Sequence, residues 1–153
     1  MGILPALELH LQQAHTDNKV KAIWICTNLL SGNDDSVRER AISKFFTNSS
    51  KLIAQKILSE LLTGQNRRVK KEGLWFLNNL LSAAHFEVEN LQNFLNDQNI
   101  MVVFLHGLQS QKEKALLSET AESILMLLER NTDFIETFLS NDGLAVMAGA
   151  RLG

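Results

Sequence analysis

The 153-residue sequence predicts an all-α protein built from internal repeats. It contains one proline and no tyrosine, and 45% of its residues are hydrophobic. Proline breaks helices, whereas Leu, Gln, Glu and Lys support them, so this composition favours helices. No stretch shows the sustained apolar–polar alternation that marks a half-buried strand. We therefore expect helices throughout the chain and no sheet.

Two segments of the sequence recur. Residues 91–97 (LQNFLND) return as residues 135–141 (IETFLSN), an offset of 44 residues, and residues 21–30 (KAIWICTNLL) return as residues 72–81 (EGLWFLNNLL), an offset of 51 residues. Periods of about 40–47 residues are typical of HEAT and armadillo arrays, in which each repeat consists of two or three helices. The longer offset indicates an insertion, which we place around residues 46–50.

The expected helices begin with residues 3–14 and 18–31, the second of which carries Trp24 and Asn28. Residues 32–35 (GNDD) form a turn that ends in a helix N-cap signal, so a short helix follows at 35–46. The next helix, 50–63, has an apolar stripe at helical spacing formed by Ile53, Ile57, Leu58, Leu61 and Leu62.

The second half of the chain continues the same pattern. The second Trp-containing segment lies in a helix over 66–83, and a short helix follows at 87–96. Further helices are expected at 99–110, 113–130 and 132–140, with a last piece from Gly143. The helix ends are defined to within a few residues.

Short, medium and long helices recur in this order, which is the armadillo plan rather than the two-helix HEAT plan. We expect one armadillo-type, right-handed α-solenoid of about three repeats, incomplete at both ends. Its parts are approximately a partial repeat 1–33, repeats 34–84 and 85–131, and a partial repeat 132–153. The ends of a solenoid normally require polar caps. The chain is therefore expected to belong to a longer array or to pack its ends against partners.

Charge and composition limit the class of partner and the cellular compartment that the sequence fits. Fifteen Lys and Arg residues against 17 Asp and Glu residues give a net charge of −2, which argues against a nucleic-acid binder. The single cysteine, Cys26, cannot form an internal disulfide and fits a reducing compartment. The longest apolar run, residues 100–105, is too short to span a bilayer, and no secretion signal opens the sequence. We expect a cytoplasmic or nuclear protein without membrane insertion.

Two segments resemble one known family. Residues 21–33 (KAIWICTNLLSGN) resemble the third helix of an importin-alpha armadillo repeat, with Trp24 and Asn28 as its Trp-x-x-x-Asn core. Residues 69–80 (VKKEGLWFLNNL) are the closer match, with Glu72 before Trp75 and Asn79. The resemblance is to the later repeats of importin alpha, which form its minor cargo site.

A third copy, residues 120–125 (TAESIL), resembles a late importin repeat that has lost its tryptophan. The 44-residue offset places Glu119 where Trp75 stands and Ser123 where Asn79 stands. In importins this arrangement holds a Lys/Arg-rich nuclear localisation signal, which implies a role in nuclear import and protein transport. The peptide-binding residues implied by the resemblance are Trp24, Asn28, Glu72, Trp75, Asn79, Glu119 and Ser123.

The chemistry of these residue types supports peptide binding. A Trp and an Asn four residues apart lie on the same helix face. An Asn side chain offers a donor and an acceptor to the backbone of an extended peptide. Two neighbouring indoles form a slot for an aliphatic stem and attract its ammonium group through a cation–π contact worth about 0.5–2 kcal/mol.

A structural scaffold is the alternative interpretation. In that case the tryptophans fill a core, and the groove and the chain ends pack against fixed neighbours in a larger assembly. Lys21 stands where Glu72 stands in the next repeat, and its charge repels a basic peptide and fits an acidic one. We favour peptide binding because the duplicated Trp/Asn pair is more specific than the fold, which serves many roles.

No other motif indicates chemistry. The sequence has no P-loop, nucleophile elbow or paired carboxylates, so we expect no enzymatic activity, no metal and no cofactor. Residues 67–71 (RRVKK), the one basic cluster, are interpreted as a solvated helix start, and Cys26 as a small buried hydrophobe. Metal-ligand spacing is missing among the histidines His10, His15, His85 and His106.

Overall fold

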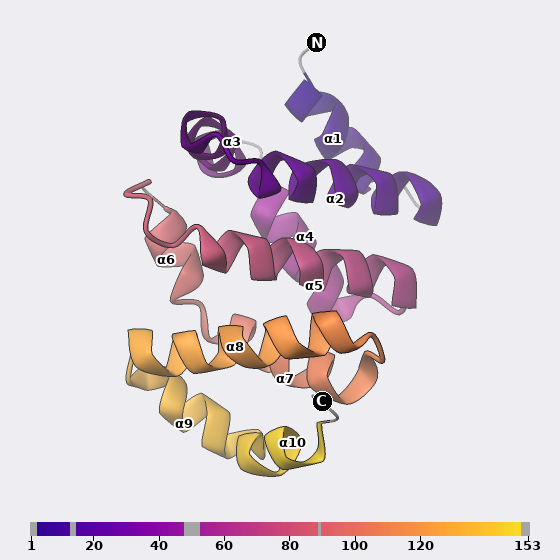
Figure 1. Cartoon of the computed structure of the whole chain (residues 1–153). Coiled ribbons are helices and arrows are strands. Elements are labelled where there is room, and N and C mark those ends of the chain that lie inside the picture. Colours follow the sequence, from indigo (N-terminus) through magenta and orange to yellow (C-terminus); the bar gives the residue numbers. More distant parts are fainter. Residues whose placement is uncertain (1–2, 13–14, 48–52, 89, 151–153) are drawn as a thin grey trace. The chain divides into compact units, whose positions relative to one another are not determined.

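The computed structural model describes residues 3–12, 15–47, 53–88 and 90–150, and every regular element in them is an α-helix (Figure 1). As the sequence predicts, no strand occurs in these residues. They form two compact units, residues 1–94 and residues 95–153. The helices are α1 (Ile3–Gln12), α2 (Thr16–Ser31), α3 (Asp35–Thr47), α4 (Ile53–Thr63), α5 (Arg67–Ser82), α6 (Leu91–Leu95), α7 (Gln98–Ser110), α8 (Lys114–Arg130), α9 (Asp133–Ser140) and α10 (Gly143–Gly149).

Each expected helix has a counterpart, with ends that differ by a few residues, and residues 13–14 and 50–52 lie outside the described part. The clearest difference is at 87–96, where α6 begins only at Leu91. Asn90 has a left-handed backbone, with φ of 68°, which interrupts a helix of L-residues. The Nε2 of Gln92 donates to the carbonyl oxygens of Ala84 (2.8 Å) and Phe86 (3.0 Å), and these bonds hold the preceding loop.

The first helix of each expected repeat varies in length. α3 has 13 residues, α6 has five and α9 has eight. Part of the longer 51-residue offset therefore lies in α3 itself. Phe46, where the insertion was expected to begin, is buried in the last turn of α3, and its ring centroid is 5.3 Å from that of Phe94. Residues 48–50 lie outside the described part.

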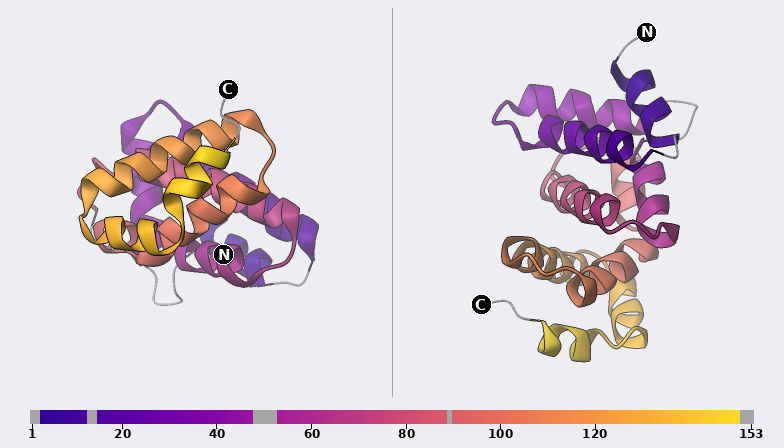
Figure 2. Two further views of the ribbon diagram at one scale, coloured as in Figure 1. Left: turned by 90° about the horizontal axis from the view of Figure 1, so that it is seen from below. Right: turned by 90° about the vertical axis from the view of Figure 1, so that its right-hand side faces the viewer.

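In the unit of residues 1–94, α2 and α5 lie side by side, α1 packs on α2, and α4 packs on α5 (Figures 1 and 2). α3 joins them through an edge-to-face contact of Phe45 with Phe76, whose ring centroids are 5.7 Å apart. The apolar stripe of α4 is buried except for Leu62, which is 40% exposed. Leu62 lies about 100° further round the helix than Leu61 and falls beyond the edge of the stripe.

The unit of residues 95–153 contains α7, α8, α9 and α10, with α8, α9 and α10 all packed on α7. Its core holds fully buried side chains from three helices, including Phe104, Ile124 and Phe134. Two polar contacts tie the helices together. The Nε of Arg130 donates to Oδ1 of Asn96 (3.1 Å), and the hydroxyl of Thr137 donates to Oε1 of Gln98 (2.6 Å).

Candidate functional site

The N-terminal ends of α2 and α5 are joined by side chains at corresponding positions. The carboxylate of Asp17 and the guanidinium of Arg68 are 2.7 Å apart, and the Nδ2 of Asn66 donates to the hydroxyl of Thr16 (3.3 Å). Asp17 and Arg68 are 51 residues apart, the same offset that relates the two tryptophans, and both helices have 16 residues. The helices are therefore parallel and in the register of the sequence repeat.

The inner faces of α2 and α5 are equivalent as well. The four buried residues of α2 have counterparts 51 residues later that are all buried. At Gly73, an added Cβ would lie 3.0 Å from the side chain of Leu61 on α4, so the small residue allows α4 to approach α5 closely. The pairs are Ala22 with Gly73, Ile23 with Leu74, Cys26 with Leu77, and Leu30 with Leu81.

The outer sides of the two helices carry the predicted site residues. Trp24 is 56% exposed, Asn28 is exposed, and Trp75 and Asn79 are half-buried. Because the helices are parallel and in register, the indoles stand at the same level on neighbouring helices, and the two amides stand one turn further along. We call this surface, formed by Trp24, Asn28, Trp75 and Asn79, the Trp/Asn face.

The two side-chain amides on this face differ in the hydrogen-bond donors and acceptors that remain available to a partner. The Nδ2 of Asn79 donates to the carbonyl oxygen of Trp75 (2.9 Å), which leaves its Oδ1 as an acceptor. In the described part of the chain, no side-chain hydrogen bond holds Asn28, so its donors and its acceptor are all available. Ser31 and Ser82 extend the equivalence, since each hydroxyl donates to the carbonyl oxygen of its Asn three residues earlier (3.2 and 2.7 Å).

Charges of both signs border the Trp/Asn face on the N-terminal side. Arg68 beside Asp17 holds the pKa of that carboxyl below its usual value, and Lys21 and His15 add smaller effects in the same direction. Lys21 is exposed and half-buried Glu72 occupies the corresponding position on α5. Since positive and negative charges alternate there, Glu72 does not give this border a net negative charge.

On α8 the burial pattern favours a different alignment of the third copy. With an offset of 43 residues, six of the eight buried residues of α5 correspond to buried residues of α8, against four of the eight with an offset of 44. Ser123, the expected counterpart of Asn79, is only 5% exposed, so its side chain offers little surface to a peptide. Shifting the alignment by one residue moves the corresponding position by about 100° around the helix.

With the offset of 43 residues, the position of Asn79 on α5 corresponds to Glu122 on α8, which is exposed. Glu119, the predicted counterpart of Trp75, is exposed but lies one position further round α8. Partial burial raises the pKa of the Glu119 carboxyl, and the charge of Glu122 adds to the effect. With the offset of 43 residues, Leu117 corresponds to Leu74, and both side chains are buried.

The remaining candidates contribute no recognisable chemistry. Cys26 is fully buried, and burial raises the pKa of its thiol to about 12. No group of His, Cys, Asp and Glu side chains in the described ranges has the arrangement of a metal site. Within those ranges, no helix is both long and apolar enough to cross a membrane.

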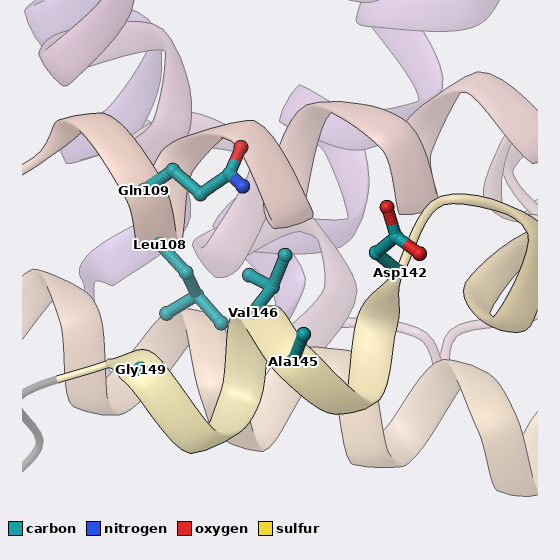
Figure 3. A pocket seen from close by; sticks show the side chains of 6 residues that line it. All are labelled: Leu108, Gln109, Asp142, Ala145, Val146 and Gly149. Carbon is teal, nitrogen blue, oxygen red and sulfur yellow. The ribbon is translucent and has the colours of Figure 1, made fainter.

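A shallow hollow of about 410 Å³ lies between α7 and α10 (Figure 3). Leu108 and Val146 point toward one another inside it, and Gln109 and Asp142 lie at its edge. Asp142 is its one ionisable side chain, so the hollow has no acid–base or nucleophilic pair. Comparison with known proteins adds no further site, since no family model, curated protein or solved structure matches the chain.

Proposed function

We propose that the protein is an interaction module that binds an extended peptide across the Trp/Asn face. The observation that carries the proposal is the 56% exposure of Trp24 on a helix held in repeat register with the helix of Trp75. Single exposed apolar side chains are common, but an aromatic residue that recurs at the same position of two parallel neighbouring helices offers a partner a paired contact surface.

Binding on this face would use two kinds of contact. The amide of Asn28 and the Oδ1 of Asn79 would pair with the backbone of the peptide, as extended chains require. The indoles of Trp24 and Trp75 would enclose one of its side chains, and an ammonium or guanidinium group there would gain a cation–π contact.

The resemblance to importin alpha gives the finer form of the proposal. In that form the helices are armadillo repeats of a right-handed solenoid, the peptide is rich in Lys and Arg, and the protein serves nuclear import between cytoplasm and nucleus. Support comes from the equivalence of α2 and α5, whose buried residues correspond at the 51-residue offset. The positive charges of Lys21 and Arg68 repel a basic peptide at the N-terminal border. The preference of the two indoles for basic side chains would therefore be only modest.

A structural scaffold is the second candidate, and the exposed apolar side chains of α9 and α10 favour it. Ile135, Leu139 and Leu144 are 45%, 54% and 69% exposed. In a larger assembly these side chains would pack against a neighbouring subunit. This candidate does not require the Trp/Asn face to bind a free peptide.

Titration with fluorescently labelled peptides separates the two candidates. A Lys/Arg-rich peptide and an uncharged peptide of the same length are added to the full chain, and fluorescence anisotropy is followed at physiological salt. Peptide binding predicts saturable curves, and Asn28→Ala and Asn79→Ala each weaken them about fivefold, because a lost hydrogen bond costs about 1 kcal/mol.

The matched control is Asn93→Ala, which removes an exposed asparagine from α6 and leaves the affinity unchanged. A basic peptide that binds more tightly than the uncharged one supports the importin-like form. If neither peptide binds, or if all three variants behave alike, the scaffold is the better account.

A further inference from the structure

The exposed side of α8 combines apolar and acidic side chains in a regular order. Leu125 and Met126 are 52% and 45% exposed. Glu122 lies three and four residues before this pair, and Glu129 lies four and three residues after it. Side chains three or four residues apart are neighbours on a helix, so one carboxylate lies one turn before the apolar pair and another one turn after it. We call these four residues the α8 face.

Among the described residues, none of the ion pairs involves the carboxylates of Glu119, Glu122 or Glu129. Glu119 adds a third carboxylate one turn before Glu122 and Ser123. Its pKa is raised mainly by desolvation, and the negative charge of Glu122 adds to the effect. The unit of residues 95–153 is acidic as a whole, with eight Asp and Glu residues against four Lys and Arg residues.

Such a surface is complementary to one kind of partner. Large apolar side chains that stay in water mark interaction sites, and charges around an apolar centre select the partner by opposite charge. We propose that the α8 face is a docking surface for a partner segment in which Leu- or Met-like side chains are flanked by Lys or Arg. The apolar side chains would cover Leu125 and Met126, and the cations would meet Glu122 and Glu129.

None of the four residues belongs to the Trp/Asn face, although Glu122 occupies on α8 the position of Asn79 on α5, so the two surfaces are tested separately. Its partner is defined by an apolar centre as well as by charge. A peptide that is basic but lacks apolar side chains should therefore bind the α8 face only weakly.

The experiment uses the full chain and a labelled peptide in which a Leu-Leu pair is flanked on both sides by Lys residues. Fluorescence anisotropy is measured at about 0.05 M and about 0.5 M salt, because screening weakens exposed ion pairs. We expect saturable binding that weakens with salt. Leu125→Ser should weaken it about tenfold, because an apolar contact is lost, and Glu122→Gln combined with Glu129→Gln should reduce the salt dependence.

The peptide carries Lys residues, which also suit the Trp/Asn face, so the variants are compared in a chain that carries Trp24→Ala. The matched control is Ile135→Ser, which removes an apolar side chain of similar exposure from α9 and should not change the affinity for this peptide. The proposal is overturned if the peptide does not bind the Trp24→Ala chain, or if Leu125→Ser and Ile135→Ser behave alike in it.

Discussion

Adjacent residues on α2 should respond very differently to truncation, because they point about 100° apart around the helix axis, one into the core and the other toward solvent. Ile23 is fully buried, whereas Trp24 is 56% exposed. Replacing a fully buried Ile by Ala costs about 2–5 kcal/mol, since apolar contacts are lost and a cavity remains. Trp24 is less than half buried, so truncating it to Ala should lower the free energy of unfolding by only about 1 kcal/mol.

The assay is urea unfolding of Ile23→Ala and Trp24→Ala, followed by far-ultraviolet circular dichroism. This signal does not depend on the tryptophan that one variant removes. The unfolding midpoint should fall clearly more in Ile23→Ala than in Trp24→Ala, with the slope unchanged in both variants. Leu74→Ala on α5 should resemble Ile23→Ala, because Leu74 corresponds to Ile23 and is equally buried.

A result in which Trp24→Ala destabilises the chain as much as Ile23→Ala would refute this reasoning. Trp24 would then be a core residue, and α2 would be rotated from the orientation described above. That result would favour the scaffold interpretation, in which the tryptophans fill a core.

Three further expectations concern the core. Phe45→Ala removes the edge-to-face contact with Phe76 and should lower the free energy of unfolding by about 3–5 kcal/mol in a urea titration. Gly143→Ala should cost about 1–3 kcal/mol, read as a lower Tm, because the added Cβ would overlap the ring of Phe138. The thiol of Cys26, with a pKa raised to about 12, should resist a thiol reagent at mildly alkaline pH and react once the chain unfolds.

The sequence predicts the helices of this protein well, since their apolar spacing and cap residues are local signals. The equivalence of α2 and α5 is visible in the 51-residue repeat, and the structure places both helices in that register. The repeat also relates Asp17 to Arg68, yet their ion pair could not be predicted, because an offset alone does not show that two helices are parallel neighbours.

The sequence is less informative where local signals are weaker. α8 has no tryptophan to fix its alignment with α5, and the 44-residue offset of residues 91–97 fits its buried residues less well than an offset of 43. With the shorter offset, buried Ser123 corresponds to buried Leu80. The late start of α6 depends on the left-handed backbone of Asn90 and on the bonds of Gln92 to the preceding loop, which helical periodicity does not detect.

The most direct test of the central claim uses the indole N–H signals of the two tryptophans in a ¹H–¹⁵N NMR spectrum. The full chain is titrated with whichever of the two unlabelled peptides, Lys/Arg-rich or uncharged, binds more tightly. If the peptide lies across the Trp/Asn face, the signals of Trp24 and Trp75 shift together and with the same midpoint. If neither signal moves, or if only one does, the two indoles do not form one binding surface.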